Sequence, residues 1–202
     1  MRRLRPVLTP CRIHLRAHYT DREPITHPGV EFRLASRGEV VHAAADPAIG
    51  LDADNVSVAP ARGDFGSAAF VGDQMVAYTW RSFTGAPHIE DIWVHVQRPN
   101  RYGYVAFPRP EYRGRQVQDP ISLLTDQRRL ERGYTHSLSF VETHNCPSIA
   151  SDMRRGNVLT GWAGCLQRPG GYLMFRTPGV KKHHFRFYVP SREEPGKHSE
   201  VQ

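Results

Sequence analysis

The segment from residue 102 to residue 157 constrains the fold of this chain more than any other part of the sequence. An apolar strand pattern at 102–107 leads through Pro-Glu-Tyr-Arg-Gly-Arg (residues 110–115) into a helix pattern, and a second strand then precedes Asn145 and another helix. A strand, a glycine-containing loop and a helix in succession can place backbone N–H groups around a phosphate at the helix N-terminus. The segment therefore predicts a phosphate-binding loop in a mixed α/β domain.

The two helices of this segment begin with recognisable signals. Asp119 is a preferred N-cap residue, and Pro120 suits the first helical position, where no amide donor is needed. Residues 135–143 alternate between apolar and polar side chains, as in a strand with one buried face. Asn145 then has the residue type of an N-cap for the second helix. We therefore expect the order β-α-β-α from residue 102 onward.

Strand patterns dominate the residues that precede this segment. Residues 66–71 and 75–83 flank Gly72-Asp73, a dipeptide typical of a two-residue hairpin turn. Residues 89–97 supply a third strand, and the apolar run at 102–107 is the fourth. We expect an antiparallel meander followed by β-α-β-α-β-β, which is a mixed α/β (α+β) sheet.

The length of the chain, 202 residues, suits a single domain with irregular ends. Residues 1–28 show no sustained periodicity and are interpreted as an N-terminal arm. Residues 29–190 are expected to form the domain, closed by strands at 159–166 and 171–175. Residues 191–202 have the composition of a polar tail.

The composition favours a soluble basic protein. Apolar residues make up 39% and charged residues 23% of the chain, as is usual for globular proteins. The formal net charge of +7 attracts anionic ligands such as phosphates over long range. Much of this excess lies near the two ends of the chain, so a solvated basic periphery is the alternative interpretation.

The three cysteines, Cys11, Cys146 and Cys165, have no paired short spacing. This pattern argues against a disulfide framework and against a zinc site, and it makes a reducing cytoplasm the expected location. No run approaches the ~18 apolar residues of a membrane-spanning helix, so no membrane association is expected.

The residues of the central segment resemble the GNAT superfamily of N-acyltransferases. The family turn has the form Pro-Glu-Tyr-Arg-Gly-X-Gly-X-Gly, and residues 110–115 match its opening. Asn145 and Ser148 match the Asn-x-x-Ala/Ser that opens the later helix of the family. The resemblance covers roughly residues 64–180. It implies a GNAT-like fold in which the fourth and fifth strands splay apart.

The resemblance also implies a co-substrate, acetyl-CoA or another acyl-CoA, and no metal. Pantetheine would bond to the backbone of the fourth strand and pyrophosphate to the amides of the turn. The turn departs from the family at Gln116 and Gln118, where glycines would let the backbone approach more closely. Arg113 and Arg115 can bind phosphate oxygens in compensation. The implied binding residues are Val105, Ala106, Phe107, Arg113, Gly114, Arg115, Gln116, Val117, Gln118, Asn145 and Ser148.

The reaction that the resemblance implies is direct attack of an amine on a thioester. It needs a base for the proton of the amine and in some enzymes an acid for the departing thiolate. Glu90, at the start of the third strand, is the candidate base, and Tyr104 and His144 are candidates for the acid. Many relatives use a Tyr at the position that Asp152 occupies here. A solvated strand end, a packed aromatic and a turn residue are the respective structural alternatives for Glu90, Tyr104 and His144.

Two classes of function remain open. The first is an N-acyltransferase for a small-molecule or peptide amine, supplied with the acyl group by CoA or by an acyl carrier protein. The second is a non-catalytic protein of the same fold that binds nucleic acid or an acidic partner. Nucleic acid is disfavoured because aromatic residues do not alternate with the basic residues at the chain ends. A homodimer is compatible with both classes.

Overall fold

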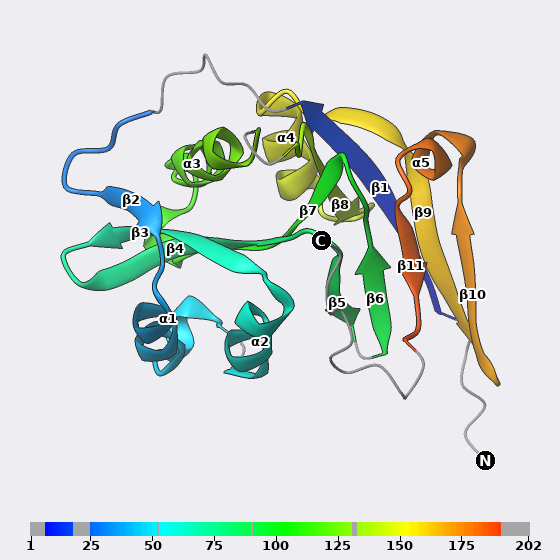
Figure 1. Cartoon of the computed structure of the whole chain (residues 1–202), viewed down its shortest axis with the longest axis horizontal. Helices are drawn as coiled ribbons and strands as arrows, with labels where there is room; N and C mark the ends of the chain where they lie inside the picture. Colours follow the sequence, from blue (N-terminus) through cyan, green and yellow to red (C-terminus); the bar gives the residue numbers. More distant parts are fainter. Residues whose placement is uncertain (1–6, 18–24, 52, 90, 131–132, 191–202) are drawn as a thin grey trace. The chain divides into compact units, whose positions relative to one another are not determined.

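The computed structural model describes residues 7–17, 25–51, 53–89, 91–130 and 133–190 (Figure 1). The expected polar tail at 191–202 therefore lies outside the described residues. The strands are β1 (Val7–Ala17), β2 (Glu31–Leu34), β3 (Phe65–Val71), β4 (Gln74–Ser82), β5 (Gly85–Ile89), β6 (Ile92–His95), β7 (Asn100–Pro108), β8 (His136–Glu142), β9 (Val158–Arg168), β10 (Gly171–Arg176) and β11 (Arg186–Tyr188). The helices are α1 (Arg37–Ala44), α2 (Ala53–Val58), α3 (Gln118–Leu130), α4 (Cys146–Arg154) and α5 (Pro178–Lys182), with single 3₁₀ turns η1 (Pro47–Ile49), η2 (Pro60–Arg62) and η3 (Pro110–Tyr112).

The strands form one large sheet and one small sheet. The large sheet has the strand order β10-β9-β1-β8-β7-β4-β3-β2, and the small sheet has the order β11-β6-β5. The β7–β8 pair is parallel, whereas β1 pairs antiparallel with β8 and β9, β10 with β9, and β3 with β2 and β4. The mixed α/β fold expected from the sequence is thus confirmed. Within the described ranges, no helix is both long enough and apolar enough to cross a membrane.

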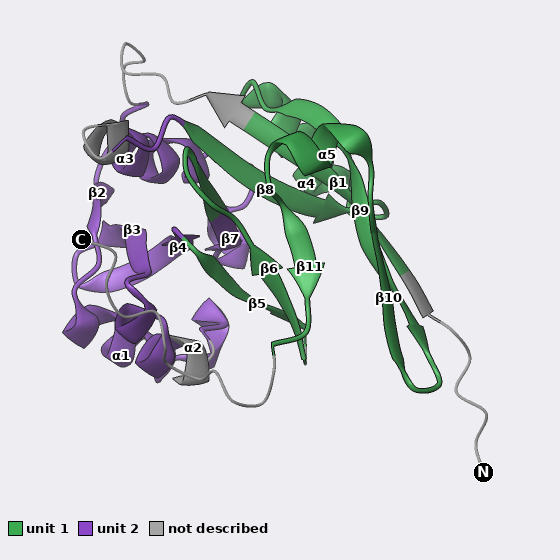
Figure 2. Cartoon of the chain, turned by 45° about the vertical axis from the view of Figure 1, so that its right-hand side comes forward, with its two compact units in different colours: residues 1–17, 84–102, 136–195 green, residues 18–83, 103–135, 196–202 purple. Residues whose placement is uncertain are grey.

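Contacts divide the chain into two compact units, which are coloured separately in Figure 2. Unit 1 consists of Met1–Ala17, Thr84–Tyr102 and His136–Pro195. Unit 2 consists of His18–Phe83, Gly103–Thr135 and Gly196–Gln202. Each unit therefore combines segments that are distant in the sequence.

Unit 2 contains the meander β2–β3–β4 with helices on both of its faces (Figure 1). Val71 pairs with Gln74 across the expected Gly72-Asp73 hairpin, where Gly72 has a φ of 57°. On the α3 side, Val117 and Ile121 pack against a buried cluster from β3 and β4. Apolar burial of this kind is the main force that holds a helix on a sheet.

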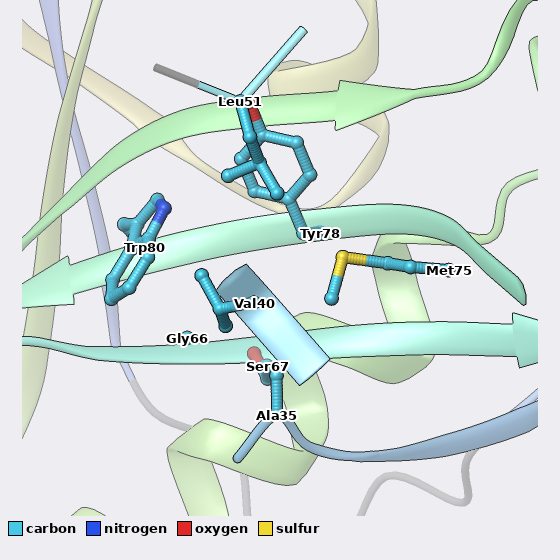
Figure 3. Close-up of a pocket in the computed structure, with 8 residues that line it drawn as sticks. All are labelled: Ala35, Val40, Leu51, Gly66, Ser67, Met75, Tyr78 and Trp80. Carbon is cyan, nitrogen blue, oxygen red and sulfur yellow. The ribbon is translucent and has the colours of Figure 1, made fainter. Parts of the chain in front are cut away.

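The α1 side of the same sheet is also closely packed. Val40 of α1 and Leu51 lie against Met75, Tyr78 and Trp80 of β4, as the close-up in Figure 3 shows. The space left between these side chains is about 10 Å³. Because such a volume barely holds one water molecule, the space between these side chains is part of the core and is too small for a ligand.

Unit 1 is built around β1, which lies between β8 and β9 and pairs antiparallel with both. Its central residue Ile13 is completely buried. The interpretation of residues 1–28 as an irregular arm is therefore wrong for residues 7–17. The ladder to two neighbours satisfies the backbone groups of β1, so the strand is an integral part of the sheet.

The expected third strand at residues 89–97 is confirmed only for residues 92–95, which form β6 in the small sheet instead of a strand of the meander. A turn at Asp91 divides this region into β5 and β6, which pair with each other in the small sheet. Gly85 permits this pairing, because a Cβ atom there would lie 2.2 Å from the carbonyl oxygen of Val94. Glu90, the candidate base, lies outside the described residues.

Candidate functional site

The site expected from the sequence begins in β7, which changes its partners partway along. Residues 100–102 pair in parallel with residues 136–138 of β8, and this described ladder ends at Tyr102. From Gly103 onward, β7 belongs to unit 2, where it neighbours β4. The second half of β7 therefore has no described ladder to β8.

Val105 breaks the regular backbone of β7. Its φ is 46°, in the left-handed region, although its side chain is β-branched. A residue of this type at positive φ is a true outlier, and such strain concentrates at functional sites. Val105 is 46% exposed, and the next residue, Ala106, is exposed as well. The predicted pantetheine-binding residues therefore begin with an irregular backbone at Val105 and include two exposed residues, Val105 and Ala106.

The loop that follows β7 contains two left-handed residues. Gly114 has a φ of 75° and Gln116 a φ of 58°. Arg113 itself is extended, with a ψ of 147°. Left-handed residues in a turn can direct neighbouring N–H groups toward one anion. The sequence analysis treats Gln116 as a departure that disfavours this geometry. The structure shows that Gln116 adopts a glycine-like conformation.

Several amides of this loop remain available to a ligand. Among the described residues, the N–H groups of Gly114, Gln116 and Val117 donate no hydrogen bond, whereas Asp119 N donates to Gln116 O at 3.2 Å. The loop leads directly into α3, whose first residue, Gln118, adds one further N–H group at the helix N-terminus, whereas Pro120 has none. Together these groups form a partial positive charge suited to a phosphate.

The charged side chains of the loop lie in solvent. Arg113 and Arg115 are exposed, and their guanidinium carbons lie 5.8 Å from the Phe107 ring and 5.4 Å from the Tyr112 ring. Contact with an aromatic face limits the motion of each guanidinium without consuming its hydrogen-bond donors. The Gln118 side chain instead donates to Tyr78 O at 3.3 Å, so only its backbone amide can serve a ligand.

Arg109 anchors the start of the loop, and the sequence analysis does not identify it. This buried residue donates from its backbone N–H to Val76 O at 2.8 Å and from Nε to Met75 O at 2.8 Å. Its Nη2 donates to the Asp46 carboxylate. Three bonds to two separate segments fix the point at which the chain leaves β7.

Tyr104, a candidate acid, is a buried structural residue. Its hydroxyl donates to Asp64 Oδ2 at 2.7 Å, and Arg62 Nη2 donates to the same oxygen at 2.8 Å. Burial and the neighbouring Asp64 carboxylate raise the pKa of Tyr104 far above its ordinary value. Burial also raises the pKa of Asp64, although Tyr104 and Arg62 oppose this shift. The phenol is therefore a very weak acid, and we assign it no proton transfer.

His144, Asn145 and Ser148 lie in unit 1. His144 is exposed, and its Nε2 lies 3.2 Å from Glu142 Oε2. Asn145 caps α4, since its Oδ1 accepts a hydrogen bond from Ser148 N at 3.2 Å. The Asn-x-x-Ser pattern thus has a local structural purpose in this chain, and its role in binding a ligand stays a prediction.

Asp152, which stands where many relatives have an acidic Tyr, is buried in unit 1. Its Oδ2 lies 3.1 Å from His14 Nδ1 and accepts from Ser139 Oγ at 2.9 Å, and its Oδ1 pairs with Arg155. Burial alone would raise the pKa of Asp152, but these partners lower it to about 2. An ionised carboxylate cannot donate a proton, so Asp152 does not replace the missing acid.

The structure thus brings most of the predicted binding residues into one segment of unit 2. These are Val105, Ala106, Phe107, Arg113, Gly114, Arg115, Gln116, Val117 and Gln118. Neither Arg109 nor Asp64 has a sequence signal, because the partners that bury them lie far away along the chain. The left-handed φ of Val105 likewise has no sequence signal, since valine rarely adopts it.

Comparison with solved structures identifies the fold. A GCN5-related N-acetyltransferase from Kribbella flavida matches with a TM-score of 0.52 and 14% identity, over 82% of this chain and 61% of that protein. A tandem GNAT protein from the clavulanic acid biosynthesis pathway matches with a TM-score of 0.51 and 13% identity, over 91% and 55%. A GCN5-related N-acetyltransferase from Sphaerobacter thermophilus matches with a TM-score of 0.50 and 13% identity, over 86% and 52%.

The chain therefore spans between about half and three fifths of the length of these proteins. No family model and no curated protein matches its sequence. The solved structures nevertheless share its mixed sheet across most of the chain. The resemblance seen in the sequence is confirmed at the level of the fold: this chain has the fold of the GCN5-related N-acetyltransferases, the GNAT superfamily.

Proposed function

We propose that this protein is an acyl-CoA-dependent N-acyltransferase that moves an acyl group, most simply acetyl, from a thioester to an amine. The observation that carries this proposal is the loop before α3, in which Gly114 and Gln116 are left-handed and neighbouring amides donate no described hydrogen bond. The GNAT fold supports the proposal at a coarser level.

The residues of unit 2 fit the two polar parts of such a co-substrate. The amides of the loop and the guanidiniums of Arg113 and Arg115 would hold the pyrophosphate. The backbone at residues 105–107, where Val105 and Ala106 are exposed, would hold the pantetheine. When bound, acyl-CoA supplies a thioester carbonyl that an amine can attack.

The proposed reaction also requires residues that accept and donate protons. The attacking amine loses a proton as its bond to the acyl carbon forms, and the departing thiolate gains one. His144, which is exposed beside Glu142, remains a predicted acid. Glu90 remains the predicted base.

Thermal denaturation tests the proposed binding. Acetyl-CoA at about 1 mM should raise the melting temperature by several degrees, because a ligand present at about a hundred times its Kd stabilises the native state by about 2.7 kcal/mol. Arg113→Glu should abolish this shift, since it places a negative charge beside the pyrophosphate. Arg168→Glu, an equal charge change at an exposed site outside the loop, is the matched control and should keep the shift.

The outcomes separate the proposal from its alternatives. Release of free CoA thiol that depends on an added amine would establish transfer. A shift with a phosphopantetheine-loaded carrier protein, and none with acetyl-CoA, would favour the carrier-dependent reaction. If neither donor changes the melting temperature, the protein is a non-catalytic member of the fold.

A further inference from the structure

Unit 2 also contains a concave site, to which Arg109 contributes. Its volume is about 560 Å³, within the range of roughly 300–1,000 Å³ that is typical of small-molecule sites. Its walls come from α1, from β2, from the β3–β4 hairpin and from the residue that follows β7. The polar side chains that line it are Arg33, Glu39, His42, Asp46, Asp73, Gln74 and Arg109.

Both guanidiniums of this cavity already have acidic partners. Arg33 pairs with Glu39 and with Glu31, whose Oε1 lies 3.1 Å from Arg33 Nε, and its guanidinium lies 3.8 Å from the centre of the Phe70 ring. Arg109 pairs with Asp46. Neither arginine therefore has its full charge available to an anionic ligand.

The carboxylates of the cavity outnumber its guanidiniums. Glu39, Asp46 and Asp73 face Arg33 and Arg109. The pKa of Glu39 is lowered by hydrogen bonds from Ser36, and the pKa of Asp46 by its hydrogen bond from Arg109, so both carboxyls are ionised at neutral pH. Asp73, at the tip of the hairpin, is exposed and has no cationic partner among the described residues. The cavity is thus locally acidic in a chain of net charge +7.

We propose that this cavity binds a small organic cation, an ammonium or guanidinium group carried on a short carbon skeleton. Asp73 and the exposed part of Asp46 attract the cationic group, and the volume of the cavity leaves room for the skeleton. A cation completes the charge balance of the walls, whereas an anion would have to displace a carboxylate from one of the arginines. The inference does not depend on acyl transfer, because binding requires no thioester.

Calorimetric titration of the whole protein with agmatine, in the absence of any CoA compound, tests this inference. Agmatine carries one guanidinium and one ammonium group. Asp73→Asn should weaken its binding about fivefold or more, as expected for a lost ion pair of about 1 kcal/mol. Asp91→Asn removes the same charge from an exposed turn outside the cavity, and it should leave the affinity unchanged within about twofold.

A second variant tests the cavity itself. Gly38 lines the site, and a Cβ atom there would meet no heavy atom within 4 Å. Gly38→Trp should therefore fold normally, as its melting temperature would show, and fill the site so that agmatine no longer binds. Equal weakening by Asp73→Asn and Asp91→Asn, unchanged binding in Gly38→Trp, no heat with about 1 mM agmatine, or binding of inorganic phosphate in its place would each overturn the inference.

Discussion

Val105 and Gln116 are both non-glycine residues with a positive φ, and they lie within one short stretch of unit 2. Each such residue costs the fold about 1–2 kcal/mol relative to an ordinary backbone conformation. Favourable packing and hydrogen bonds elsewhere in the unit must offset this conformational strain. Strain of this size at an exposed strand and at the following loop is expected where backbone groups must face a ligand instead of a neighbouring strand.

Replacement of Val105 by glycine should stabilise the protein by roughly 1 kcal/mol. Glycine adopts positive φ without steric cost, and little apolar burial is lost because Val105 is 46% exposed. Chemical denaturation gives the free energy of unfolding.

Val71→Gly is the matched control, at a strand residue that is 38% exposed and has no positive φ. It should destabilise the protein by about 0.5–1 kcal/mol, as glycine normally does in a strand. If both substitutions destabilise the protein equally, Val105 is not strained in solution.

The ionisation of Asp152 should make the free energy of unfolding depend on pH in the acidic range. Its pKa in the folded protein is about 2, below the ordinary 3.8, because His14, Arg155 and Ser139 outweigh the effect of burial. A depressed pKa contributes stability that is complete above about pH 4 and is lost as the pH falls toward 2. Asp152→Asn should therefore destabilise the protein by about 2 kcal/mol at pH 7 and by much less near pH 2.

Urea denaturation at several pH values measures this linkage. The exposed Asp91→Asn variant controls for the general effect of a lost carboxylate. A constant difference between wild type and Asp152→Asn across the whole pH range would show that the carboxylate does not titrate in the way the structure indicates.

Individual residues were the hardest part of this protein to predict. The position of the loop at residues 110–118 follows from local sequence, and so do its two arginines. The partners of Tyr104 and of Asp152 do not, because they come from Asp64 and His14, which are distant in the chain. A buried pairing between distant residues is decided by tertiary packing, and no local pattern records it.

Among the secondary-structure elements, β1 depends most on such packing. Cys11, Ile13 and Leu15 alternate with Arg12 and His14, which is a strand period. Over residues 1–28 as a whole this period is not sustained, which favours the interpretation as an arm. His14 is in fact buried against Asp152. The signals of α3 and α4 were easier to interpret because proline and cap residues act locally.

Ile13→Ala should be the most damaging of these substitutions. Ile13 is fully buried in a strand with neighbours on both sides, and truncation of a buried Ile costs about 2–5 kcal/mol. The matched control is Ile25→Ala, at a residue that is exposed in unit 2. It should change the free energy of unfolding by less than about 0.5 kcal/mol.

A comparable loss from the two variants would mean that residues 7–17 are not a core strand in solution. Unfolding measured by circular dichroism distinguishes the two results.

At the scale of the whole molecule, the class of the fold was predictable and its division was not. The meander, the loop and the helix pattern establish a mixed sheet. Along the chain, stretches of unit 1 alternate with stretches of unit 2. The boundaries between them, at Ala17, Phe83, Tyr102 and Thr135, coincide with no change in amino-acid composition. Such boundaries follow from which strands pair, and pairing between distant strands is weakly encoded by local sequence.

The position of β1 has a consequence for biosynthesis. A ribosome releases residues 7–17 long before residues 136–142 and 158–168, the two strands that flank them in the finished sheet. Until both have emerged, the first strand has exposed edges and no permanent partner, a situation that invites pairing with other nascent chains. Unit 1 should therefore mature only after residues 158–168 have left the ribosome, and slow codons between the first strand and these residues would lengthen this vulnerable interval.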